Sequence, residues 1–248
     1  MNSETRKPER NFLLSCFPDS TQRSCPFSGF LVFKFLLFFV IASSVHAEPL
    51  APNDVKALIQ RIREKRAAAP QVQADFTEDK AMRMMNKPVV SSGKVWFQAP
   101  NKFRREVNGN SPSTTVSDGQ QLWIYYPKFQ SAEQYSLGRR GPLDAGIAAI
   151  TASLNLEAVE NTYGITGSRE GNRYVLELLP KTPAVKRMLQ RFVIHFNEAL
   201  QVERTEMLQP NGDRIVTTYS NESRAPIDPG TFNFTPPAGT NVTTPLGR

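Results

Sequence analysis

The sequence contains little of the material from which redox centres and metal sites are built. Its 248 residues include only two cysteines, Cys16 and Cys25, and two histidines, His46 and His195. Three of these four residues lie within the first 47 positions. The chain from residue 48 onward therefore lacks the side chains for a disulfide framework, a cysteine metal site or a histidine metal cluster.

Motifs that bind nucleotides or form catalytic centres are also missing. Neither the phosphate-binding P-loop nor the dinucleotide-binding glycine motif occurs. Carboxylate pairs, such as Glu78 with Asp79 and Glu203 with Glu206, stand among basic residues, as on a solvated surface. Alternation within RFVIHF places His195 opposite the phenylalanines, where a lone histidine is structural or solvated. We therefore expect no enzyme activity, no catalytic residue, no cofactor and no metal.

An apolar run long enough to span a bilayer is absent from the N-terminal region. The run that follows Lys34 covers residues 35–42, whereas a spanning helix needs ~20 residues. Small residues follow and end at Ala47, a pattern typical of a secretory signal peptide. We predict a leader over 1–47 that is cleaved after Ala47, with an uncleaved anchor as the alternative. We expect a single domain over 48–248.

An excess of charge that would indicate a nucleic-acid partner is lacking too. Without residues 1–47 the formal net charge falls from +7 to +5. The basic residues are spread along the chain and interleaved with acidic ones, whereas nucleic-acid binders concentrate them on one face. We expect no nucleic-acid partner, and at most a modest attraction to anionic lipid surfaces or acidic partners.

Helical spacing of apolar residues occurs in two segments. The pattern predicts an amphipathic helix over 53–69, with Asn53 or Asp54 as its cap and Pro70 after its end. Its apolar positions are Val55, Leu58, Ile59 and Ile62. A second pattern in 141–160 predicts a short inserted helix, which is either a lid or an ordinary crossover helix. Its apolar positions are Leu143, Ile147 and Ile150 or Leu154.

The remainder has short β-branched and aromatic runs separated by turn signals, which predicts an antiparallel meander. The turn signals are Gly93, Asn108-Gly109, Asp118-Gly119, Glu170-Gly171 and Asn211-Gly212. The expected strands are 72–83, 89–98, 102–107, 113–118, 121–127, 130–136, 162–168, 172–179, 189–197, 200–208 and 213–222.

The predicted meander is rich in bulky apolar residues, but the chain has too few helices to cover both of its faces. The bulky apolar residues include Phe76, Met82, Met84, Met85, Val95, Phe97, Phe103, Trp123, Tyr125, Phe129, Tyr135 and Leu137. Ordinary core packing explains many of them singly. If the sheet curls into an incomplete barrel, however, its concave face must hold something apolar. An acyl-chain cavity is then a physical hypothesis, because burial of each methylene is worth about 0.8 kcal/mol.

Four stretches together resemble the periplasmic lipoprotein carrier family LolA. They are ADFTE at 74–78, GKVWF at 93–97 leading to PNKFR at 100–104, VSDGQQLWIY at 116–125, and FNFTPP at 232–237. The resemblance implies a mainly β fold with helices. It implies an open, strongly curved antiparallel sheet, an incomplete β-barrel, covered by an N-terminal helix and an inserted helical lid.

The resemblance also implies site residues. Phe103 matches an aromatic at the cavity mouth, where partners dock, and Leu143, Ile147 and Ile150 fall in the lid. The expected acyl-chain cavity and lid comprise Phe76, Met84, Val95, Phe97, Phe103, Trp123, Tyr125, Leu143, Ile147 and Ile150. The family commonly has an arginine before the proline of PNKFR that latches the lid, but this chain has Ala99, which has no donor. Arg104 or Arg105 is a candidate substitute.

The function implied is a monomeric periplasmic carrier that shields the acyl chains of lipoproteins. It would receive lipidated lipoproteins from an inner-membrane ABC-type releasing complex and pass them to an outer-membrane, LolB-like receptor. Two alternatives remain: a carrier of another lipid or glycolipid for a dedicated exporter, and a regulatory relative that senses lipids or lipoproteins.

Overall fold

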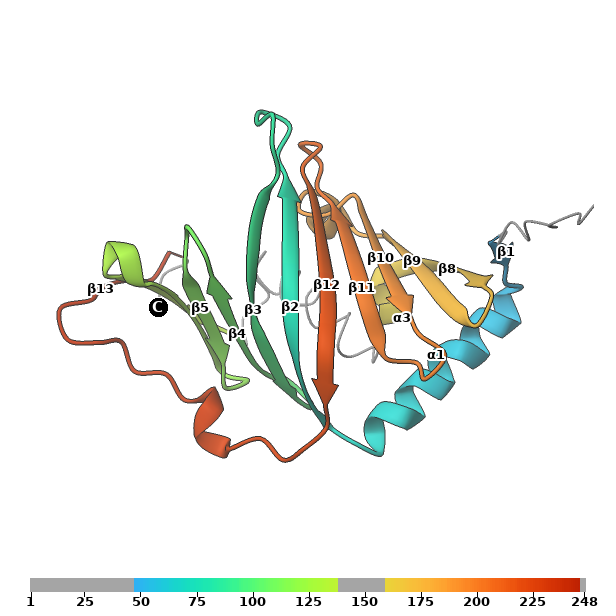
Figure 1. Ribbon diagram of the computed structural model, residues 1–248, viewed down its shortest axis with the longest axis horizontal. Helices are drawn as coiled ribbons and strands as arrows, with labels where there is room; N and C mark the ends of the chain where they lie inside the picture. The colour runs from blue at the N-terminus through green and yellow to red at the C-terminus, as the bar shows by residue number, and fades with distance from the viewer. Residues whose placement is uncertain (1–46, 138–158, 246–248) are drawn as a thin grey trace, which may run out of the picture. The chain divides into compact units, whose positions relative to one another are not determined.

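A single thirteen-stranded sheet dominates the computed structural model, which describes residues 47–137 and 159–245 (Figure 1). Its strand order is β1-β8-β9-β10-β11-β12-β2-β3-β4-β5-β6-β7-β13. Neighbouring strands are antiparallel except for β7 and β13, which are parallel. The prediction of an open, strongly curved, mainly antiparallel sheet is confirmed.

All eleven predicted strands occur, and their ends lie within two residues of the predicted ones. Among the strands of the described residues, only β1 and β13 have no predicted counterpart, because two or three residues are too few to carry an alternating pattern. The strands are β1 (Glu48–Pro49), β2 (Gln71–Ala81), β3 (Val89–Gln98), β4 (Lys102–Asn108), β5 (Ser113–Ser117), β6 (Gln121–Tyr126), β7 (Ser131–Ser136), β8 (Tyr163–Glu170), β9 (Arg173–Pro180), β10 (Arg191–Phe196), β11 (Val202–Leu208), β12 (Arg214–Ser223) and β13 (Asn241–Thr243).

The main helix, α1, covers Pro52–Ala67, close to its predicted range. The prediction that Asn53 or Asp54 caps it is wrong, because the cap position is Ala51 and Pro52 begins the helix. Proline suits this place, since its fixed φ is helical and its missing N–H has no partner there anyway. The short helices are η1 (Pro127–Phe129), α3 (Val159–Thr162), α4 (Pro183–Lys186) and η2 (Pro229–Phe232).

The predicted lid lies almost wholly outside the described residues. Leu143, Ile147 and Ile150 all fall in residues 138–158, which the description does not include. Among the residues that are described, no helix is long and apolar enough to cross a membrane.

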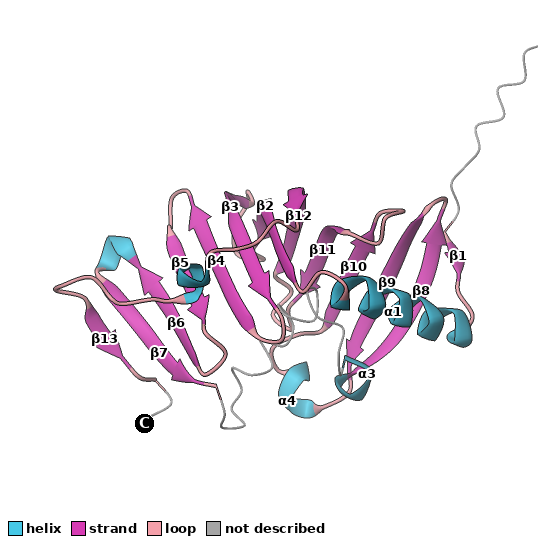
Figure 2. Ribbon diagram, turned by 90° about the horizontal axis from the view of Figure 1, so that it is seen from below, coloured by secondary structure: helices cyan, strands magenta, loops and turns pink. Residues whose placement is uncertain are grey.

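The largest core cluster joins α1 to one half of the sheet (Figure 2). The apolar face of α1 is buried against residues of β9 and β10, and Ile62 and Ile194 are each 0% exposed. The cluster includes Val55, Leu58, Ile59 and Ile62 of α1 with Leu176, Leu178, Phe192, Ile194 and Phe196 of the sheet. Since α1 ends at Ala67, its packing leaves the central strands β2–β4 to a separate small cluster.

Two glycines that served as turn signals have different roles. Gly119 adopts φ +95°, which favours glycine, in the turn between β5 and β6. Asp118 stabilises this turn, because its Oδ1 accepts hydrogen bonds from the backbone N–H groups of Gln120 and Gln121, both at 2.8 Å. Gly93, in contrast, lies inside β3 and marks no turn. A β-carbon there would lie 2.7 Å from the Phe76 ring, so this position has room only for glycine.

Candidate ligand cavity

The strand register separates the residues of the sheet into two faces. Residues directly opposite one another in an antiparallel ladder point to the same side. One such row runs across β2 to β7 and defines the face that we call the cavity face: Val72, Phe97, Phe103, Ser117, Leu122 and Tyr135. The adjacent row defines the outer face: Gln73, Trp96, Arg104, Val116, Trp123 and Gln134.

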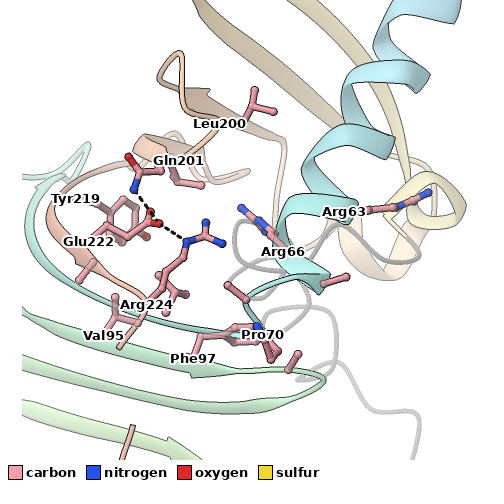
Figure 3. A pocket seen from close by; sticks show the side chains of 16 residues that line it. Arg63, Arg66, Pro70, Val95, Phe97, Leu200, Gln201, Tyr219, Glu222 and Arg224 are labelled. Atoms are coloured by element: carbon pink, nitrogen blue, oxygen red, sulfur yellow. Dashed lines mark hydrogen bonds and ion pairs between the residues drawn. The ribbon is translucent and has the colours of Figure 1, made fainter. Parts of the chain in front are cut away.

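A cavity lies on the cavity face beyond the C-terminal end of α1 (Figure 3). It is lined by the end of α1, the first half of β2, the end of β3, the β10–β11 turn and β12. Its apolar wall comprises Ala67, Ala69, Pro70, Val72, Ala74, Val95, Phe97, Ala99, Leu200, Val202 and Tyr219. We call it the α1 cavity.

Positive charge gathers at one side of the α1 cavity. Arg63, Arg66 and Arg224 line it together with one carboxylate, Glu222. The Glu222 carboxylate accepts hydrogen bonds from Arg224 Nε and Gln201 Nε2, both at 3.2 Å (Figure 3). Burial of the Arg66 guanidinium lowers its pKa to about 10. The positive charge of Arg224 also lowers this pKa, whereas the negative charge of Glu222 raises it. An anionic group entering here would therefore meet partly desolvated guanidinium groups.

A second cavity continues along β2 and shares Val95 and Tyr219 with the first. Its walls come from β2–β4 and β10–β12, and we call it the central cavity. They include the apolar side chains of Phe76, Val95, Phe103, Phe192, Met207, Ile215 and Tyr219.

An ion pair stands within the central cavity. Arg105 donates to Glu78 Oε2 at 2.6 Å, and the Arg105 guanidinium lies 4.3 Å from the centre of the Phe76 ring. Thr217 Oγ1 also donates to Glu78, at 3.3 Å. Because each charged group has partners, the pair is compatible with a lining that is mostly apolar.

Of the residues predicted for an acyl-chain cavity, the structure brings four together. Val95 and Phe97 line the α1 cavity, and Phe76, Val95 and Phe103 line the central one. Ala99, the altered latch position, lies at the α1 cavity, where its N–H donates to the carbonyl oxygen of Pro70 at 2.8 Å.

The two candidate latch substitutes already have partners. Arg105 pairs with Glu78 inside the central cavity. Arg104 lies on the outer face, where it contacts Glu106 at 2.7 Å and donates to the carbonyl oxygen of Thr231 at 3.0 Å. Arg104 therefore points away from both cavities.

Trp123 and Tyr125 were also predicted for the acyl-chain cavity, but they lie on the outer face of the sheet. The ring of Phe234, from the segment that follows η2, packs on both, with centroid distances of 5.8 Å to Trp123 and 5.7 Å to Tyr125. Leu122 shares a register row with Phe97 and Phe103, so Leu122, Ile124 and Tyr126 are the β6 residues on the cavity face. Neither Trp123 nor Tyr125 is among the residues that line the two cavities.

Met84 was also predicted for the acyl-chain cavity, but it too lies away from both cavities. It lies in the loop between β2 and β3 and is 98% exposed. Among the described residues, therefore, Met84 does not pack in either cavity.

Several lining residues were not predicted, although some had a signal. Arg66 follows Ile62 by one helical turn, on the buried side of α1. Val72 and Ala74 alternate with Phe76 along β2, which places them on the same face. Tyr219 carries no such signal, because its position depends on β12 pairing with β2, far away in the sequence.

The outer face of β10–β12 carries a charged cluster around Glu206. His195 lies here, opposite the buried Phe192, Ile194 and Phe196, which confirms its predicted placement. Glu206 forms ion pairs with Arg204 at 2.9 Å and with Arg214, and its Oε1 lies 3.4 Å from His195 Nε2. Burial alone would raise the pKa of Glu206, but the hydrogen bond from Arg214 and the surrounding positive charges lower it. In the described residues, no group of three or more His, Cys, Asp or Glu could hold a metal ion.

Comparison with known families gives one match. The family model described as "Outer membrane lipoprotein carrier protein LolA" matches residues 67–235, more than half of the chain. The outer-membrane lipoprotein carrier protein of Dechloromonas aromatica is 29% identical over 173 residues, which cover 69% of this chain and 80% of the relative. The protein of that name from Nitrosospira multiformis is 26% identical over 212 residues, which cover 84% and 94%.

Solved structures with partial similarity include a LolA superfamily protein from Nitrosomonas europaea. It has 12% identity and a TM-score of 0.40, and the match covers 72% of this chain and 97% of that one. An uncharacterized conserved protein from Thermus thermophilus has 10% identity and a TM-score of 0.48, with coverage of 77% and 99%.

Proposed function

Because this chain belongs to the LolA family of outer-membrane lipoprotein carrier proteins, we propose that it carries the acyl chains of lipoproteins through the periplasm. The single observation that supports this most directly is the pair of adjoining cavities on the cavity face of the sheet. They share Val95 and Tyr219, and their walls are largely apolar. A carrier needs such walls and no reacting group.

The expected affinity follows from burial of hydrocarbon. Each methylene removed from water contributes about 0.8 kcal/mol, so ten buried methylenes contribute about 8 kcal/mol before the cost of ordering the chain. Apolar contact is non-directional, and a cavity lined by aromatic and aliphatic side chains therefore accepts acyl chains of different lengths. One carrier would in this way serve many lipoproteins that share only their lipid.

The proposal includes a route and partners. The chain would be exported and cleaved after Ala47, and residues 48–248 would act as one domain. It would accept lipoproteins from an inner-membrane ABC-type releasing complex and deliver them to an outer-membrane receptor. Phe103 would lie near the point of transfer, where it lines the central cavity at 2% exposure.

The test fills the cavity and follows release of lipoprotein from inner-membrane vesicles. Ala74→Trp puts a large ring on the wall of the α1 cavity, opposite Val95, which both cavities share; Ala74 itself is only 6% exposed. Thr77→Trp is the matched control, because Thr77 lies on the outer face of the same strand and is exposed. We expect the wild type and the control to release lipoprotein, and the Ala74→Trp variant to release much less. A wild type that carries no lipidated cargo and releases none would refute the proposal.

A second candidate, a carrier of free anionic lipid, is favoured by the charge at the α1 cavity. Three arginines and one glutamate line it, an arrangement that suits a phosphate or carboxylate headgroup. Mass spectrometry of the molecule that co-purifies separates the two functions. Lipidated N-terminal peptides support the lipoprotein carrier, and free phospholipid or glycolipid supports the alternative.

A further inference from the structure

The loop between β2 and β3 presents apolar side chains to solvent. It covers residues 82–88 and, in Figure 1, stands beyond the ends of the neighbouring strands. Met84 is 98% exposed and Met85 is 49% exposed. Exposing two adjacent methionines does not stabilise the fold, because removing their side chains from water would lower the free energy.

Cations flank these methionines. Arg83 and Lys87 are exposed on either side of them, and Lys80 stands at the base of the hairpin. The nearby carboxylates are Asp79 and Asp213. The hairpin from 79 to 88 thus contains three cations and one carboxylate, and its tip is positively charged as well as apolar.

Backbone contacts order the tip. The N–H of Met85 donates to the carbonyl oxygen of Met82 at 2.9 Å, which closes a turn. The N–H of Arg83 donates to Asp213 Oδ1 at 3.0 Å, from the neighbouring β11–β12 hairpin. Asp213 also accepts from Asn211, so its carboxylate is largely engaged. The loop is therefore held in a shape that presents Met84 outward, and little ordering cost would remain on binding.

We propose that this tip docks on the surface of an anionic lipid bilayer. Met84 and Met85 enter the boundary between headgroups and acyl chains, while Arg83 and Lys87 contact the anionic headgroups. Long flexible side chains next to cations suit this interface, because apolar burial and charge attraction add together there. Methionine is well adapted to it, since its unbranched thioether fits irregular surroundings.

This contact goes beyond the proposed carriage of acyl chains. None of Arg83, Met84, Met85 and Lys87 lines the α1 or the central cavity. The tip would bring the carrier to a membrane whatever the cavities hold. The two functions can therefore fail separately, and each has its own readout.

The test is flotation of the full chain with vesicles of 70% phosphatidylcholine and 30% phosphatidylglycerol, with pure phosphatidylcholine as the comparison. We expect binding to the anionic vesicles. The double variant Arg83→Gln/Lys87→Gln should weaken it by about 25-fold, since each cation near such a surface contributes about fivefold. The double variant Met84→Gln/Met85→Gln should weaken it at least about tenfold.

Phe129→Gln provides the matched control. Phe129 is 76% exposed and follows Lys128, but it lies in η1, the short helix between β6 and β7. It should leave vesicle binding unchanged, which separates a specific tip from general exposed hydrophobicity. Lipoprotein release from inner-membrane vesicles that lack anionic lipid should be unaffected by the tip variants.

A second readout follows the tip directly. In a chain with Cys16→Ser and Cys25→Ser, a Met84→Cys variant carries an environment-sensitive dye, whose emission should rise and shift to the blue on anionic vesicles. The proposal is overturned by absent flotation of the wild type, by equal binding of the methionine variant, or by dye emission that changes only when a protein partner is added.

Discussion

Gly93→Ala should destabilise the protein, because Gly93 lies against the backbone of β4 and against the Phe76 ring, which lines the central cavity. A β-carbon built on Gly93 would lie 1.8 Å from the carbonyl oxygen of Glu106 on β4 and 2.7 Å from Cζ of Phe76. The first contact is with backbone and cannot be relieved by a side-chain rotation. The strands β3 and β4 must separate locally, and the Phe76 ring must also move.

The magnitude follows from these two contacts. Overpacking of this kind costs about 1–3 kcal/mol, and weakening one backbone hydrogen bond adds about 1 kcal/mol. We expect a loss of roughly 2–4 kcal/mol, a large share of the roughly 5–15 kcal/mol that typically stabilises a domain. In urea this lowers the unfolding midpoint by about 1–2 M, given an m-value near 2 kcal/mol/M.

The matched control is Gly164→Ala in β8. There the nearest atom to an added β-carbon is the carbonyl oxygen of Leu179, at 3.8 Å, which is ordinary contact. Alanine restricts the unfolded chain, so this variant should be neutral or more stable by up to about 1 kcal/mol. If Gly93→Ala unfolds within about 1 kcal/mol of the wild type, the close approach of β4 and Phe76 to Gly93 is refuted. A displaced Phe76 should also reduce lipid uptake by the central cavity.

Three further changes test other parts of the molecule. Ile62→Ala should cost about 2–5 kcal/mol of unfolding free energy, since Ile62 is 0% exposed, while Arg61→Ala on the exposed side of α1 should change it by less than about 0.5 kcal/mol. Phe234→Ala should cost about 0.5–1.5 kcal/mol for each lost ring contact and alter the near-UV circular dichroism of Trp123; an unchanged spectrum would place that ring elsewhere. Glu206 has a lowered pKa in the folded state, so its stabilising effect is present above the unfolded value of 4.5 and is lost as the pH falls; unfolding free energy should decline less below pH 4.5 in Glu206→Gln than in the wild type.

The sequence predicted the strands well because each strand carries its own alternation and turn chemistry. The turn at Asp118 and Gly119 shows this, since a local carboxylate and a positive φ define the hairpin without any distant contact. The interpretation of Gly93 as a turn signal was wrong for the opposite reason. Its role depends on Phe76 from β2 and Glu106 from β4, and a local pattern does not contain such neighbours.

The same limit explains the cavity residues. Alternation alone shows that Trp123 and Tyr125 share a face, and that Leu122 and Ile124 share the other. Which face is the cavity face depends on register carried across five strands, from Val72 in β2 to Leu122 in β6. The outer rings are then covered by Phe234, which is more than a hundred residues further along the chain.

The unbroken apolar run of β6 therefore serves two purposes at once. Its outer residues attach the C-terminal segment to the sheet through Phe234, and its inner residues extend the cavity face. Such a strand can be apolar on both sides, because Phe234 packs on its outer rings and Leu122 on its inner side is only 2% exposed. Met84 is the contrasting case, since it is as apolar as these residues but 98% exposed. An apolar residue that the fold leaves uncovered points to a partner outside the chain, and for this tip the flanking cations favour a membrane.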